Sequence, residues 1–95
     1  MSARFRLTAI YSVPDFDRWA EVVRAAQRRV PGVERMTVHR SVDDPNEVMV
    51  ELEVESVEIA QTVLKGQNLH DLLDRAGIDF YPPIFIGEQV DELSF

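Results

Sequence analysis

The 95-residue sequence contains no cysteine, so the chain has neither a disulfide nor a thiol nucleophile, and its stability must come from packing. Cations are also scarce, because 10 Lys and Arg residues face 17 Asp and Glu residues, for a formal net charge of −7. Nucleic-acid binding needs a basic face, and an acidic surface is repelled by anionic membranes. We therefore expect neither nucleic acid nor a membrane as a partner.

Long apolar runs and phosphate-binding glycine motifs are missing too. No stretch approaches the ~20 residues of a membrane-spanning helix, and the first residues lack the apolar segment of a signal peptide, which favours a cytoplasmic protein. The four glycines form no phosphate loop, nucleophile elbow or dinucleotide fingerprint. His39 and His70 lack the spacing of metal ligands, and no HExxH motif exists. We predict no cofactor and no metal.

The clearest structural signal is a β-hairpin. Residues 34–41 and 48–54 are two runs in which apolar and polar side chains alternate, the period of a β-strand. Between them lies Asp43-Asp44-Pro45-Asn46, a sequence typical of turns. On the second run, one face carries Val48, Val50, Leu52 and Val54, and the other carries Met49, Glu51 and Glu53.

The remaining strands and helices are predicted from the spacing of apolar residues and from the residues that cap or end each element. Residues 4–13 alternate and stop at a proline, which predicts a first strand. An apolar stripe over residues 16–30 predicts an amphipathic helix that Asp15 caps and Pro31-Gly32 ends. Residues 57–76 favour a kinked or two-piece helix, with Asn68 capping its second piece and Gly77 ending it. A last strand begins at Ile84, after two prolines.

The order β-α-β-β-α-β is the ferredoxin-like arrangement, an α+β fold in which two helices cover one face of a four-stranded antiparallel sheet. A chain of this length, with 45% hydrophobic residues, makes one domain over residues 1–95. Ile10, Met49 and Phe85 would place apolar groups on the sheet face away from the helices. We therefore predict a homodimer through the sheet face, which would cover them.

Three stretches carry a family resemblance: ValProAspPheAspArgTrp at 13–19, ArgSerValAspAspProAsnGluVal at 40–48, and AlaGlyIle with a later proline at 76–83. They resemble the small dimeric α/β-barrel proteins of the antibiotic-biosynthesis-monooxygenase-like group, including its short cyclase-like members. The shared motifs are a cap, a turn and a helix stop, so they indicate the fold and carry no chemistry. The resemblance implies that two sheets pair into an eight-stranded barrel.

Members of that group include cofactor-independent oxygenases of polyketide-like aromatics, haem-degrading enzymes, isomerases, and proteins without known activity. The haem-degrading branch carries an asparagine on the first strand and a tryptophan near the second helix. Here the first strand has no asparagine, and the single tryptophan, Trp19, lies on the first helix. His70 alone matches that branch, so haem is not expected.

Five side chains are candidates for a ligand site. Tyr11 and His70 are the candidate catalytic residues, since a phenol or an imidazole can exchange a proton with a substrate. The candidate substrate-binding residues are Trp19, Tyr81 and His39. Each has a structural alternative: a polar sheet face for His39, a solvated helix surface for His70, and the core or a satisfied hydroxyl for the aromatic residues.

A binding site lined by aromatic side chains with few polar groups favours a flat apolar or aromatic ligand. The sequence thus predicts a small-molecule-binding protein of this barrel type, either a cofactor-independent monooxygenase or a cyclase/isomerase acting on an aromatic or polyketide-like substrate. The alternative is a non-catalytic ligand-binding or interaction module of the same fold.

Overall fold

The computed structural model describes residues 4–25 and 32–95. Along the chain it places β1 (Phe5–Ser12), α1 (Phe16–Ala25), β2 (Val33–Arg40), β3 (Glu47–Val54), α2 (Val57–Lys65), α3 (Gln67–Arg75) and β4 (Ile84–Glu88). The predicted β-α-β-β-α-β order is confirmed, as is the division of the second helix into two pieces. The end of the predicted first helix, from residue 26 to Pro31, lies outside the described residues.

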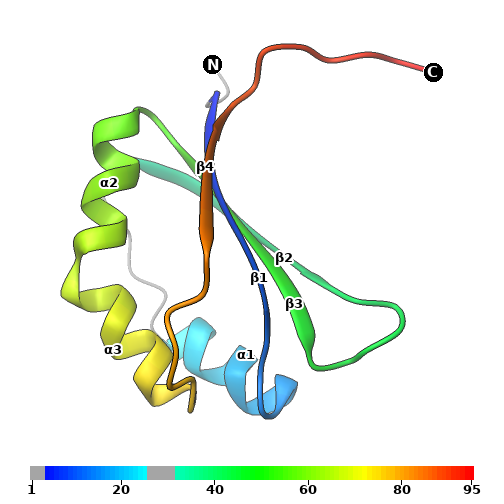
Figure 1. Ribbon diagram of the computed structural model, residues 1–95, viewed down its shortest axis with the longest axis vertical. Helices are drawn as coiled ribbons and strands as arrows, with labels where there is room; N and C mark the ends of the chain where they lie inside the picture. The colour runs from blue at the N-terminus through cyan, green and yellow to red at the C-terminus, as the bar shows by residue number, and fades with distance from the viewer. Residues whose placement is uncertain (1–3, 26–31) are drawn as a thin grey trace.

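The strands form one antiparallel sheet in the order β2-β3-β1-β4. The helices lie on one side of it (Figure 1), which confirms the ferredoxin-like fold. We call the opposite side the open face. The predicted alternation holds in β3, because Val48 and Val54 are buried toward the helices.

The core fills the space between sheet and helices in two clusters. The larger one surrounds Trp19, which is only 2% exposed, and joins α1 to the end of α3. The smaller one packs Leu7 and Val54 of the sheet against Ala60 of α2. Because alternate strand residues point to opposite faces, one set of apolar positions builds both clusters.

The helix ends are set by short-range hydrogen bonds. The carboxylate of Asp15 accepts a hydrogen bond from the backbone N–H of Asp17 at 3.1 Å, as expected for the predicted N-cap. The predicted cap at Asn68 is wrong, because α3 begins at Gln67 with Gly66 as its N-cap. Gly66 has an extended backbone, with φ −73° and ψ 144°, and also ends α2. A single residue thus interrupts the helix, which leaves Asn68 inside the first turn of α3.

Candidate functional site

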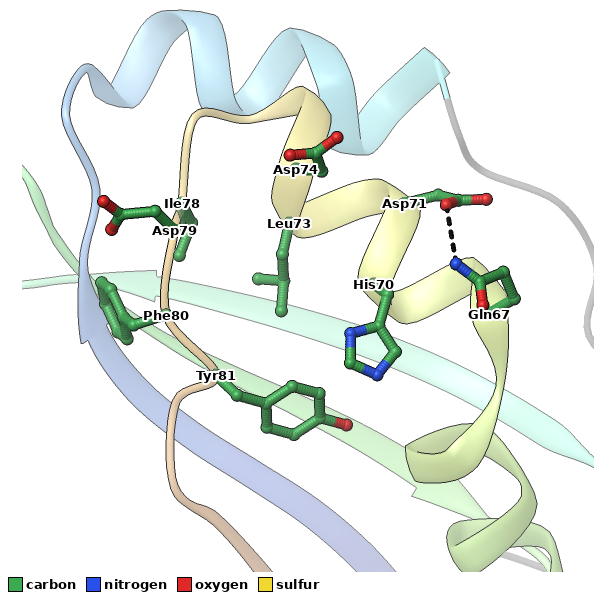
Figure 2. A pocket seen from close by; sticks show the side chains of 9 residues that line it. All are labelled: Gln67, His70, Asp71, Leu73, Asp74, Ile78, Asp79, Phe80 and Tyr81. Carbon is green, nitrogen blue, oxygen red and sulfur yellow. Dashed lines mark hydrogen bonds between the residues drawn. The ribbon is translucent and has the colours of Figure 1, made fainter.

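A cavity of about 370 Å³ lies between α3 and the chain that follows it (Figure 2). Gly77, with φ 78°, reverses the chain after α3. Its N–H donates to the Asp74 carbonyl and that of Ile78 to the Leu73 carbonyl, the two bonds of a Schellman motif. The following residues therefore run back along α3. The lining consists of Gln67, His70, Asp71, Leu73, Asp74, Ile78, Asp79, Phe80 and Tyr81.

Two of the predicted site residues meet in this cavity. The rings of His70 and Tyr81 have centroids 5.0 Å apart, and Figure 2 shows the imidazole directed from α3 toward the phenol ring. The Tyr81 hydroxyl donates to the Leu64 carbonyl at 2.6 Å. Leu64 lies in the last turn of α2, where carbonyls lack an intrahelical partner. This hydrogen bond fixes the position of the Tyr81 ring beside His70.

The cavity combines an apolar base with an acidic rim. Leu73 and Ile78 are each 5% exposed and belong to the Trp19 cluster. The exposed ring of Phe80 adds a second aromatic surface beside Tyr81. The carboxylates are those of Asp71, Asp74 and Asp79, and no Lys or Arg is among the lining residues. This charge balance disfavours anionic ligands.

Tyr11 and Trp19 form a separate pair that does not line this cavity. The indole N–H of Trp19 donates to the Tyr11 hydroxyl at 3.2 Å, and the rings meet edge to face with centroids 6.3 Å apart. Burial raises the pKa of Tyr11 above 10.0, and the hydrogen bond from Trp19 acts in the opposite direction. The Tyr11 hydroxyl therefore stays protonated at neutral pH.

His39 lies on the open face, on the side of the sheet away from the cavity. It stands opposite Met49, and Arg35 and Thr37 precede it on the same face of β2. Ion pairs surround this part of the face: Arg6 with Glu51 at 3.6 Å, Arg6 with Glu53 at 3.6 Å, and Arg35 with Glu53 at 3.4 Å. The fold thus brings together His70 and Tyr81, pairs Tyr11 with Trp19, and separates His39 from both pairs.

The acidic rim was not predicted, although a sequence signal for it exists. Gln67, Asp71 and Asp74 are spaced i, i+4 and i+7, which places them along one side of a helix. The amide of Gln67 donates to Asp71 at 3.2 Å. The missing information was the path of the chain after Gly77, which brings Asp79 and Phe80 to the same place.

Within residues 4–25 and 32–95, no three His, Asp or Glu side chains are grouped as metal ligands. Of the helices that the structure describes, none has the length and apolar character needed to cross a bilayer.

No protein-family model matches the sequence, and no curated protein matches it significantly. Solved structures do match. A candidate antibiotic biosynthesis monooxygenase from Bordetella bronchiseptica superposes with a TM-score of 0.76 at 16% identity, covering 93% of this chain and 98% of that one. SnoaB, a cofactor-independent oxygenase from Streptomyces nogalater, gives 0.69 at 13% identity, covering 98% and 97%. An ethyl tert-butyl ether d (ethd) family protein from Bacillus halodurans gives 0.67 at 24% identity, covering 92% and 99%.

The chain therefore has the fold of the antibiotic-biosynthesis-monooxygenase-like proteins, and the predicted resemblance is confirmed at the level of the fold. Identities of 13–24% leave the chemistry to be argued from this chain's own residues.

Proposed function

We propose that the cavity beside α3 binds a flat aromatic or polyketide-like molecule and that His70 exchanges a proton with it. The main support for this proposal is the position of His70 beside the Tyr81 ring, with the ring centroids 5.0 Å apart. Both side chains line the same cavity as the apolar residues Leu73 and Ile78. A planar ligand gains contact area on Phe80 and Tyr81, which are 48% and 43% exposed. The carboxylates at the rim disfavour nucleotides and sugar phosphates.

The reaction class that suits these groups begins with removal of an acidic proton from a phenol or enol. Histidine is the side chain best suited to this step near neutral pH. The deprotonated ligand then either supplies electrons to dioxygen itself or takes the proton back at another atom. The first route is that of a cofactor-independent oxygenase, as SnoaB is. The second is that of an isomerase or cyclase.

One observation favours a non-catalytic binding module instead. Among the described residues, no polar or charged side chain is buried, so the cavity offers no desolvated titratable group. Catalytic acids and bases are commonly desolvated to shift their pKa. In this second candidate function, the same cavity holds the same class of ligand without turnover.

We also propose that the protein is a homodimer through the open face. Ile10 is 59% exposed and Phe85 is 71% exposed there, on the side that the helices leave uncovered (Figure 1). If the open face packed against the same face of a second subunit, both side chains would be removed from water. The support is the apolar exposure on the face of the antiparallel sheet that the helices leave uncovered.

The test of the cavity is a binding titration with an oxygen electrode running in parallel. The probes are an anthrone, a hydroquinone and, as an anionic control, ATP. We expect saturable binding of the aromatic probes, and Phe80→Ala should weaken it at least several-fold. Gln61→Ala, on the exposed surface of α2, is the matched control and should bind like the wild type.

The two candidate functions separate in the His70→Ala variant. Oxygen uptake or isomer formation that disappears in this variant, with binding retained, supports the enzyme. Aromatic binding without turnover in the wild type supports the binding module. Binding of ATP but of neither aromatic probe would contradict the ligand class.

A further inference from the structure

We propose that the ligand of the cavity beside α3 is a flat aromatic molecule that carries a positively charged amine. This ligand class rests on the function proposed above and adds a charge to the ligand. Three features support it: the carboxylates at the rim of the cavity, its exposed aromatic rings, and the negative charge that proton removal creates.

The rim of the cavity is acidic on two sides. Asp71 and Asp74 come from α3, and Asp79 comes from the chain that returns along it (Figure 2). The lining residues include no Lys or Arg. Within residues 4–25 and 32–95, the ion pairs between side chains lie on the open face, and none includes these three aspartates. A cationic group on the ligand is therefore the charge that this rim attracts.

Aromatic surface in the same cavity points to the same class of ligand. Acidic side chains on a protein surface are often simply solvated, so the rim alone does not define a ligand. The rings of Phe80 and Tyr81, however, are also exposed here. The face of an aromatic ring carries negative charge density and attracts an organic cation. A ligand whose flat part lies on these rings and whose amine faces a carboxylate uses both kinds of group.

The spacing of the carboxylates and the size of the cavity favour an organic cation over a metal ion. Among the described residues, no three His, Asp or Glu side chains are grouped as metal ligands, so the three aspartates do not converge on one point. The cavity volume of about 370 Å³ is at the lower end of the ~300–1,000 Å³ of small-molecule sites. Such a cavity accommodates one or two fused rings with a short amine side chain.

The proposed reaction also favours a ligand with its own positive charge. When His70 takes a proton from a phenol or enol, the ligand is left with a negative charge, which the carboxylates of the rim repel. The imidazolium formed in the same step offsets this repulsion only while His70 holds the proton. Stabilising the negative charge that develops is often the largest contribution to catalysis. An ammonium group on the ligand supplies this stabilisation, because deprotonation then gives a zwitterion and not an anion.

Three catechols that share one ring and differ in the charge of the side chain test this inference. Dopamine is a cation, ethylcatechol is neutral and dihydrocaffeate is an anion. Each is titrated into the wild-type protein by calorimetry without oxygen, so that the catechols are not oxidised. At low salt we expect dopamine to bind at least about threefold more tightly than ethylcatechol, and dihydrocaffeate to bind most weakly. In about 1 M salt, where the Debye length is ~3 Å, the preference for dopamine should largely disappear.

Variants that remove charge show whether the rim is responsible, since a chain with a formal net charge of −7 attracts cations generally. Asp74→Asn combined with Asp79→Asn removes two carboxylates of the cavity and keeps the shape of both side chains. The matched control, Glu55→Gln combined with Glu58→Gln, removes two exposed carboxylates that do not line the cavity. We expect the ratio of dopamine affinity to ethylcatechol affinity to fall at least about twofold in the aspartate variant and to keep its wild-type value in the control.

The outcomes separate the charge of the ligand from the function proposed above. Equal binding of dopamine and ethylcatechol, or an equal fall of their affinity ratio in both variants, would overturn the cationic ligand and leave the aromatic cavity intact. Binding of the anthrone without binding of dopamine would do the same. If neither the catechols nor the anthrone and hydroquinone bind, the proposed function fails together with this inference. If the aspartate variant does not fold, the wild type still decides, because a preference for dopamine that persists in high salt would contradict an electrostatic origin.

Discussion

Replacing Trp19 by alanine removes the largest fully buried side chain of the described core. Trp19 is 2% exposed and packs among Val13, Val48 and Leu73, so its removal leaves a void that touches β3, α3 and the residue that follows β1. Truncation of a buried aromatic residue costs ~3–5 kcal/mol, because the surroundings relax only partly. A small domain has a total stability of ~5–15 kcal/mol, so this single change removes a large part of it.

The hydrogen bond from the Trp19 indole N–H to the Tyr11 hydroxyl contributes a smaller amount to the free energy of unfolding. Its loss leaves the Tyr11 hydroxyl without the indole donor at 3.2 Å, but Tyr11 is only partly buried and water can replace that donor. A neutral hydrogen bond contributes ~0.5–1.5 kcal/mol net. Trp19→Phe, which keeps most of the apolar volume, should therefore cost clearly less than Trp19→Ala.

The assay is urea unfolding followed by far-UV circular dichroism, because the variants lack the only tryptophan. Phe80→Ala is the matched control, since its ring is 48% exposed and its loss should change the free energy of unfolding by less than ~1 kcal/mol. If Trp19→Ala unfolds at the same urea concentration as the wild type, the assignment of Trp19 to the core is wrong. If it also loses aromatic binding, Trp19 belongs to a ligand wall.

Two further predictions concern backbone strain and pH. Gly77→Ala should lower the free energy of unfolding by about 1 kcal/mol, because φ is 78° while the nearest atom to an added Cβ is 3.8 Å away; unchanged urea unfolding would contradict this. Tyrosinate absorbance should show one phenol titrating above pH 10.0, absent in Tyr11→Phe. Since the folded state holds this proton more tightly than the unfolded state, its contribution to stability is full below pH 10 and is lost as pH rises through the folded pKa. Titration of Tyr11 below pH 10 would refute the burial argument.

Local sequence determined most of the elements. The alternation of residues 48–54 predicted which face of β3 is buried, because strand geometry fixes the direction of every second side chain. Asp15 and Gly77 predicted a helix start and a helix stop, since a cap bonds within a few residues and a left-handed turn needs glycine. These features depend on neighbours in the chain and are therefore readable from it.

Only the tertiary structure decided the candidate site. The bond that fixes Tyr81 joins residues 17 apart in sequence, and the bond from the Phe16 N–H to the Asn46 side chain joins residues 30 apart. The sequence offered Tyr11, Trp19, His70 and Tyr81 as one set, yet packing divides them into two pairs. The spacing of apolar residues along a helix or strand predicts on which face of that element a side chain lies. Which side chains meet depends on how helices cross the sheet and where loops return, and that is set by the packing of the whole core.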